Sequence, residues 1–376
     1  MEPIGYRKEK AKKSLEKYNL DLLIASSPVN VFYTTGLPTT HVAPNPILYV
    51  LKNQYPFLSM IKEDGDESAI IWSLYDSVEE FSWIDPSEVL RAGSVEASIK
   101  LLTKKIKELG LEKATIGVES LMPRYQSEAL RKNFPEANII DSDEAFLDMR
   151  LIKTEEEIRR IKKSTEVAEK AIQACIDATE LEVLDTELLK IARRTIVEEG
   201  AWGWDHLTMN IGPSDPEAPG LGIPVTPNDI VRFDFGAVWE GYISDVSRGV
   251  VVGEEPSKAK KALDYMIQVQ EYCVENIKPG VMPKELANDA QIFLKDLTRR
   301  GFYLITGHHI GLECEEAHMF GPLSSMDIPF ETNMVLDIEV WLNVRGQGLV
   351  GVEDCYRVTE TGCERLSSLD KPTISK

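Results

Sequence analysis

The sequence predicts a two-domain α/β protein, and three observations support this. The chain has 376 residues, which is more than a single hydrophobic core usually serves. Up to residue 150, short apolar runs alternate with charged helical patterns, which is typical of an α/β domain. Beyond it, long amphipathic segments are followed by β-type runs with Gly/Pro turns. We therefore expect an amino-terminal α/β domain over residues 1–150 and a carboxy-terminal α+β domain over residues 151–376.

The first domain is expected to begin with a charged helix over residues 7–18. The segment DLLIASSPVNVFYTTG then predicts a buried strand, a Pro/Asn turn and a second apolar segment. A helix is predicted over residues 95–109. Further strands are predicted in the segments PILYVL, YPFLSMI, SAIIWSL, ATIGVES and ANIIDSD. The last two resemble short strands of a parallel sheet, because each stands next to a helical pattern.

The second domain is expected to begin with a long helix in the segment RLIKTEEEIRRIKKSTEVAEKAIQACIDA. Thr154 is a suitable N-cap for it, since three glutamates follow in the first turn. Further helices are predicted over residues 184–199, 257–276 and 283–299. The segments between them carry strand-like runs and turn signals.

Composition excludes several classes of function. Acidic residues outnumber basic ones 62 to 42, so the formal charge of −20 would repel a phosphate backbone and disfavours nucleic-acid binding. The start of the chain lacks the apolar core of a signal peptide, and no apolar run reaches membrane-spanning length. We therefore expect no membrane partner and a cytoplasmic location. The five cysteines are scattered without CxxC spacing, which favours reduced, mostly buried thiols over disulfides or structural zinc.

Two predicted hairpins carry paired carboxylates. In VRFDFGAVWEGYISDVSRGVVV, a turn at Glu240–Gly241 pairs Trp239 with Tyr242 and so places Asp234 and Asp245 on one face as diagonal neighbours. In NMVLDIEVWLNVRGQGLVGVEDCYRVTE, a turn centred on Gly346 sets Glu339 directly opposite Glu353. Close, half-buried carboxylates repel one another unless a cation intervenes. Each acid alone would fit a solvated edge position, but two same-face pairs favour a bound cation.

A histidine motif accompanies these acids. In GHHIGLECEEAH, His308 lies between Gly307 and Gly311 and follows a strand-like run. The order Asp, Asp, His, Glu, Glu resembles that of the pita-bread metallopeptidases, the family of methionine aminopeptidase, aminopeptidase P and prolidase. The opening of the chain and the segment MRLIKTEEEIRRIKKS are similar to the prolidase and creatinase branch. The resemblance therefore implies a creatinase-like amino-terminal domain, a pita-bread catalytic domain and an enzyme of Xaa-Pro dipeptidase or aminopeptidase P type.

The resemblance also implies a site for two divalent metal ions. The ligands would be Asp234, Asp245, His308, Glu339 and Glu353, with Glu353 bridging and Glu339 also moving the proton from water to the leaving nitrogen. Four oxygen ligands and one imidazole suit Mn²⁺, Co²⁺ or Fe²⁺, and Zn²⁺ is compatible. The substrate would be a small peptide or peptide-like molecule, and the enzyme a homodimer.

The substrate-handling positions depart from the family. Relatives place a histidine shortly before the first aspartate, where this chain has Glu217. His206 could replace it if the chain folds inward, although we favour a packed or surface position. The family's second histidine after GHxxG is Glu315 here, and His309 or His318 could supply the missing donor or be structural.

Two more departures lie in the second hairpin. Prolidases often carry an arginine two residues before the final glutamate, where this chain has Gly351. The usual Pro-Gly after the first glutamate is Val340–Trp341. These changes predict an altered specificity, and Glu315 would either favour a cationic or amine-bearing substrate or simply repel a peptide carboxylate. Two alternatives stay open: a non-peptide C–N hydrolase or lyase related to creatinase or ectoine hydrolase, and an inactive binding protein of the same fold.

Overall fold

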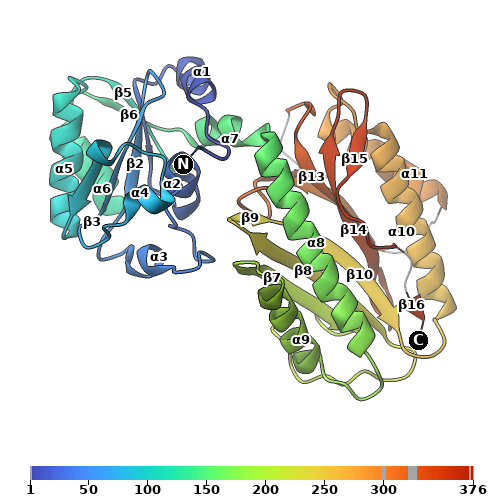
Figure 1. Ribbon diagram of the computed structural model, residues 1–376. Helices are drawn as coiled ribbons and strands as arrows, with labels where there is room; N and C mark the ends of the chain where they lie inside the picture. The colour runs from blue at the N-terminus through green and yellow to red at the C-terminus, as the bar shows by residue number, and fades with distance from the viewer. Residues whose placement is uncertain (1, 298–301, 321–327, 372–373, 376) are drawn as a thin grey trace. The chain divides into compact units, whose positions relative to one another are not determined.

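The computed structural model describes residues 2–297, 302–320, 328–371 and 374–375 (Figure 1). The chain folds into two compact units, Met1–Leu151 and Ile152–Lys376. Each unit has its own sheet and its own helices, as expected for an α/β and α+β pair of domains.

The first unit is built on a six-stranded mixed sheet with strand order β4-β3-β2-β1-β5-β6. Its strands are β1 (Leu22–Ala25), β2 (Leu58–Lys62), β3 (Glu67–Trp72), β4 (Val89–Ala92), β5 (Thr115–Val118) and β6 (Asn138–Asp141). Strand β5 pairs in parallel with both β1 and β6, which confirms the expected parallel strands. The helices are α1 (Lys8–Tyr18), α2 (Pro28–Thr35), α3 (Ile47–Leu51), α4 (Val78–Phe81), α5 (Val95–Glu108), α6 (Arg124–Asn133) and α7 (Asp143–Leu151).

Two predictions in this unit were wrong. The predicted Pro/Asn turn is the first turn of α2, because Ser27 caps the helix by accepting from the Asn30 N–H and Pro28 follows at the first helical position. The segment PILYVL is helix α3 and not a strand. A short apolar run does not reveal its period, and here Leu48 alone within the helix is buried while Val50 is exposed.

The second unit contains a ten-stranded sheet whose main path is β12-β11-β13-β14-β10-β8-β7. Its strands are β7 (Gly203–Ile211), β8 (Ile230–Trp239), β9 (Tyr242–Ile243), β10 (Val246–Val251), β11 (Phe302–His309), β12 (Ala317–Phe320), β13 (Val335–Val344), β14 (Gly348–Val358), β15 (Cys363–Arg365) and β16 (Ile374–Ser375). The helices are α8 (Glu155–Ala178), α9 (Asp185–Glu198), α10 (Ser257–Asn276) and α11 (Pro283–Leu297). Residues 298–299 of the fourth predicted helix lie outside the described residues.

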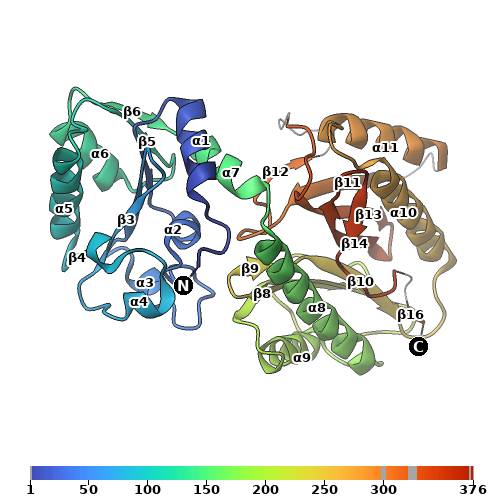
Figure 2. The same ribbon diagram turned by 45° about the horizontal axis from the view of Figure 1, so that its top comes forward.

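Helix α8 begins where the sequence predicts. The Thr154 hydroxyl accepts from the Glu157 N–H, and the Glu157 carboxylate accepts from the Thr154 N–H, which makes a capping box. The helix packs on β8, α9 packs on β7, and α10 packs on β13 and β14 (Figures 1 and 2).

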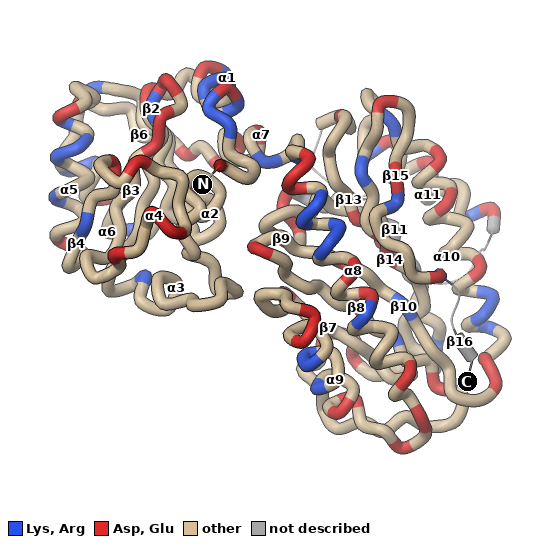
Figure 3. The backbone as a smooth tube through the Cα atoms, in the orientation of Figure 1, with Lys and Arg blue, Asp and Glu red and all other residues tan. Residues whose placement is uncertain are grey.

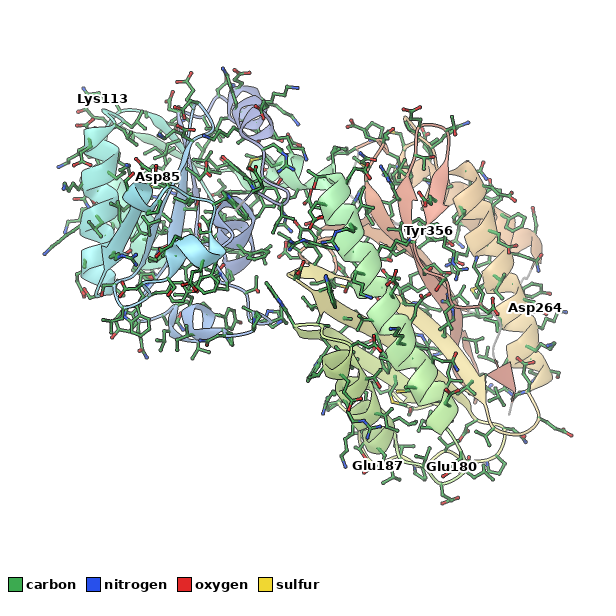
Figure 4. All side chains as sticks on the ribbon, in the orientation of Figure 1. Asp85, Lys113, Glu180, Glu187, Asp264 and Tyr356 are labelled. Atoms are coloured by element: carbon green, nitrogen blue, oxygen red, sulfur yellow. The ribbon has the colours of Figure 1, made fainter. Side chains whose placement is uncertain are left out.

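One face of this sheet forms the core and leaves the other face for a site. Phe233 and Phe235 of β8 point into the cluster that also holds residues of α8 and α9. Because side chains alternate along a strand, Asp234 between them points to the opposite face. Tyr356 of β14, labelled in Figure 4, is also buried.

The surface carries charges of both signs. Figure 3 shows acidic and basic residues along α5 and α8, and Asp85, Lys113, Glu187 and Asp264, labelled in Figure 4, are all exposed. In the described part of the chain, no helix combines the length and the apolar character needed to cross a membrane.

Candidate metal centre

Five side chains from four strands and one strand connection line a single cavity of about 570 Å³. Asp234 lies on β8, Asp245 lies between β9 and β10, and His308, Glu339 and Glu353 lie on β11, β13 and β14. All five were predicted from the sequence as metal ligands.

Strand register explains why the acids meet. Glu339 pairs directly with Glu353, Glu353 with Ser247, and Ser247 with Asp234. Directly paired residues point to the same face of a sheet, so these side chains form one row across β13, β14, β10 and β8. The small Ser247 leaves space in the middle of that row. Both predicted hairpin registers are therefore confirmed.

Among the described residues, the donor atoms form four overlapping groups, of which two contain His206, one with Asp234 and Asp245 and one with Asp205 and Cys314. Oxygens of Asp234, Glu339 and Glu353 lie within 4.8 Å of one another, and so do donor atoms of Asp245, His308 and Cys314. The Nε2 atom of His308 lies 3.6 Å from Oε1 of Glu353 and 3.9 Å from Oδ2 of Asp245, which connects these last two groups.

Electrostatics favour a cation here. Burial, together with Asp245, Glu339 and Asp234, raises the pKa of Glu353 well above its ordinary value. Burial and Asp245 raise the pKa of Asp337 in the same way. Buried carboxylates of this kind are ordinarily paired or bound to a metal. The Oδ1 atom of Asp234 also accepts no hydrogen bond within the described residues, so the donor set fits divalent cations.

His206 is part of the site, and the packed or surface position favoured from the sequence is wrong. Its Nε2 atom lies 3.1 Å from Oδ1 of Asp245 and 3.8 Å from Oδ1 of Asp234. A register shift between Trp204 and His206 sets the histidine beside Gly236, where an added Cβ would lie 2.5 Å from the imidazole Cε1. Burial alone would lower the pKa of His206, but Asp245 and the neighbouring aspartates raise it well above its ordinary value.

Arg232 is a site residue that sequence reasoning missed. Its Nη2 donates to Oδ2 of Asp234 at 2.6 Å and lies 3.6 Å from Oε1 of Glu339, while its side chain is only 5% exposed. Burial would raise the pKa of Asp234, but Arg232 and His206 hold it well below its ordinary value. The signal was present in the sequence, because Arg232 precedes Asp234 by two residues on one strand and therefore shares its face.

A neighbouring row of the sheet explains two departures from the family pattern. Trp341 pairs with Gly351, and Arg232 pairs with Gly249. An added Cβ at Gly351 would lie 2.1 Å from the Val340 carbonyl oxygen and 2.6 Å from the Trp341 Cβ, so no larger side chain fits at that position. Trp341 lines the cavity, and the basic group in this row comes from β8 and not from β14.

Cys314 also lies at the centre. Its Sγ atom lies 3.1 Å from Oδ2 of Asp245, and the residue lines the cavity. Burial, followed by Asp245, raises the pKa of its thiol. All five cysteines are free, as predicted. Cys314, however, is a half-buried residue of the site and not a thiol buried in the hydrophobic core.

The remaining candidate substrate-binding residues differ in whether they reach the cavity. Glu315 and Glu217 line the cavity. His309 lies on the other face of β11, away from the cavity, where burial and the charge of Lys153 lower its pKa to about 3. Its predicted contact with substrate is therefore wrong, because neighbouring residues of a strand point to opposite faces. His318 lies on β12, and its side chain is outside the described residues.

Two arginines close to the ligand segments in the sequence, Arg248 and Arg345, do not reach the cavity. Arg248 lies on the other face of the sheet and is paired with Asp354 at 2.5 Å, with both side chains buried. Arg345 is exposed in the turn between β13 and β14.

The fold and the site define a class of protein: a metal-dependent hydrolase with an α/β amino-terminal domain and a pita-bread catalytic domain. Residues 159–360 match Metallopeptidase family M24, and residues 7–152 match the Creatinase/Prolidase N-terminal domain. The chain belongs to metallopeptidase family M24.

Known proteins resemble the chain over nearly its whole length. It is 26% identical to the Xaa-Pro dipeptidase of Pyrococcus furiosus, over 98% of this chain and 99% of that protein. It is 28% identical to the Xaa-Pro dipeptidase of Lactobacillus delbrueckii, over 96% and 97%. The crystal structure of the prolidase from Pyrococcus horikoshii superimposes with a TM-score of 0.80 at 24% identity, covering 98% and 99%, and supports the fold.

Proposed function

We propose that this chain cleaves a peptide C–N bond in a small peptide, with two divalent metal ions held by Asp234, Asp245, His308, Glu339 and Glu353. The observation that carries the proposal is the row of carboxylates across the sheet, with Glu339 and Glu353 directly opposed on the cavity face. Directly opposed like charges destabilise a ladder unless a cation lies between them.

Metal ions in such a centre polarise the scissile carbonyl and lower the pKa of water. The protein supplies the positions and the proton transfer. Glu339 is the residue that we assign to carry the proton from the attacking water to the leaving nitrogen. Its side chain is 19% exposed, compared with 2% for Glu353, so Glu339 is better placed to meet a substrate. Nη2 of Arg232 lies 3.6 Å from Oε1 of Glu339.

We further propose that the specificity differs from that of the Xaa-Pro dipeptidases to which the chain is similar. Glu217 and Glu315 add negative charge to the cavity wall, and the indole of Trp341 adds an apolar surface. A substrate with a cationic or amine group near an apolar side chain would complement this wall. Arg232 is already paired with Asp234, so it is not freely available to a substrate carboxylate.

Several finer points belong to the same proposal. The oxygen-rich donor set favours Mn²⁺ or Co²⁺, and Fe²⁺ and Zn²⁺ are compatible. We also propose a cytoplasmic homodimer. Light scattering of the purified protein tests its assembly.

The test begins with metal content and continues with substrates. Chelator-treated protein is reloaded with Mn²⁺ or Co²⁺, and its bound metal is measured by mass spectrometry. We expect two equivalents in the wild type and a loss of both metal and activity in Asp245→Ala and Glu353→Ala. Less than one equivalent in the wild type, or unchanged metal in either variant, would contradict the assigned centre.

A dipeptide panel then separates the specificities. It compares Xaa-Pro dipeptides with dipeptides that carry lysine, arginine or an aromatic residue. We expect the highest kcat/KM for members with a cationic residue, and a decrease for them in Glu315→Gln. If only Xaa-Pro dipeptides are cleaved, the proposal of an altered specificity is wrong. If no dipeptide is cleaved by fully metal-loaded protein, the non-peptide C–N hydrolase becomes the better candidate, since the acidic wall and Trp341 also suit a small cationic compound.

A further inference from the structure

Among the described residues that line the metal centre, Cys314 supplies the one sulfur atom. Its Sγ lies 3.1 Å from Oδ2 of Asp245, and its side chain is half-buried on the cavity wall. The family pattern of ligands, two aspartates, one histidine and two glutamates, does not use this position. The thiol therefore needs its own explanation.

The geometry is that of a ligand group. Donor atoms of Asp245, His308 and Cys314 all lie within 4.8 Å of one another. Bond lengths of about 2.3 Å to sulfur and 2.0–2.2 Å to nitrogen or oxygen imply separations of roughly 3–4 Å between donors that share one ion. Two of the three separations fit that range, at 3.1 Å from Sγ to Oδ2 of Asp245 and 3.9 Å from Oδ2 of Asp245 to Nε2 of His308.

A second observation points to an ion at this place. The His308 side chain is 4% exposed, and its Nε2 faces oxygens of both Asp245 and Glu353 at 3.6–3.9 Å, beyond hydrogen-bond distance. Its Nδ1 has no hydrogen-bond partner within the described residues. A buried imidazole of this kind is aimed at the same space as the sulfur.

We propose that the sulfur of Cys314 is a sixth protein ligand, bound as a thiolate to the ion that Asp245 and His308 hold. The proposal rests on the metal centre of the proposed function. Metal binding releases the thiol proton to solvent, and the ion exchanges a water ligand for sulfur. A thiolate is a softer donor than a carboxylate, so the sulfur shifts the preference of the site from Mn²⁺ toward Zn²⁺ and Co²⁺.

The competing role for Cys314 is a neutral thiol that donates a hydrogen bond to Asp245 and never contacts metal. Serine can replace cysteine as a hydrogen-bond donor but not as a sulfur ligand. A Cys314→Ser variant keeps a donor for Asp245 but lacks the sulfur. Cys363 supplies a matched control, because it is also half-buried, its thiol lies 3.3 Å from the carbonyl oxygen of Val274, and it belongs to no metal-ligand group among the described residues.

The experiment is a Co²⁺ titration of chelator-treated full-length protein, followed by absorbance and by calorimetry. We expect a sulfur-to-cobalt charge-transfer band in the near ultraviolet for the wild type and for Cys363→Ser, and no such band for Cys314→Ser, whose visible cobalt bands persist. In competition titrations, the ratio of Zn²⁺ to Mn²⁺ affinity should fall by roughly tenfold or more in Cys314→Ser and stay unchanged in Cys363→Ser.

The outcomes that overturn the inference can be distinguished from one another. If wild-type protein binds Co²⁺ without the charge-transfer band, the proposed metal centre stands and the thiolate ligand is refuted. If wild-type protein binds no Co²⁺, the metal centre and the thiolate ligand are both refuted. A Cys314→Ser variant with the full band, or with an unchanged affinity ratio, also contradicts the assignment.

Discussion

Replacing Gly236 by alanine should remove His206 from the metal centre without altering any of the residues that line the cavity. The alanine Cβ would lie 2.5 Å from Cε1 and 2.7 Å from Nδ1 of the imidazole. Carbon atoms in contact ordinarily lie about 3.5–4.0 Å apart, so the ring has to move by about 1 Å. The present distance from Nε2 to Oδ1 of Asp245 is 3.1 Å, and such a displacement ends that hydrogen bond.

The size of the effect follows from the charge on the partner. A hydrogen bond to a charged group contributes about 1.5–3 kcal/mol, which corresponds to a decrease of roughly 10- to 150-fold in kcat/KM if the contact is retained in the transition state. The added methyl group also meets the Ser244 carbonyl oxygen at 2.8 Å, so some of the cost is general strain. This strain should be the same whether or not residue 206 is histidine.

A double-mutant cycle separates the two contributions. Gly236→Ala, His206→Ala and the double variant are compared in kcat/KM and in unfolding free energy. We expect Gly236→Ala to lose nearly as much activity as His206→Ala, and the double variant to lose little more. Full activity in Gly236→Ala, or fully additive losses, would refute the argument that Gly236 serves to seat His206.

Three further predictions concern stability. Arg248→Met should lower the unfolding free energy by about 3–5 kcal/mol, measured by urea denaturation, because it leaves the Asp354 carboxylate buried with less compensation; a loss below about 1 kcal/mol would contradict this. Burial raises the pKa of Glu67 to about 7, so the folded state favours the protonated form of this carboxyl. The stability that the protonated form contributes is present in acid and is lost as pH rises through 7. Glu67→Gln should therefore be more stable than the wild type at about pH 8.5, by roughly 1–3 kcal/mol after allowance for partial exposure, and similar at about pH 5; parallel pH curves would show otherwise. Thr154→Ala should lower the unfolding free energy by about 1 kcal/mol in thermal denaturation, and no change would mean that the capping box with Glu157 is dispensable.

The elements with a strong periodic signal were predictable, and the short apolar ones were not. Helix α8 carries a capping residue, an acidic first turn and a long amphipathic pattern, and each of these points to the same structure. Helix α3 has five residues and no side-chain capping hydrogen bond, so its sequence did not distinguish it from a strand.

In the metal centre, too, some contacts could be predicted from the sequence and others could not. Glu339 and Glu353 could be placed together because one turn residue fixes the register of a hairpin. His206 could not, because its approach to Asp245 depends on an irregularity in β7 and on the missing side chain of Gly236. Cys314 was missed because its contact with Asp245 joins two segments whose arrangement no local pattern encodes.

The carboxylate row has a consequence for synthesis of the protein. Its members and His308 come from strands that are far apart in the chain, and the last, β14, is also the central partner of β13 and β10. A growing chain that ends before Gly348 has Asp234, Asp245 and Glu339 but lacks the strand that closes the row. The row of carboxylates is therefore assembled only when β14 has been made, late in synthesis of the chain.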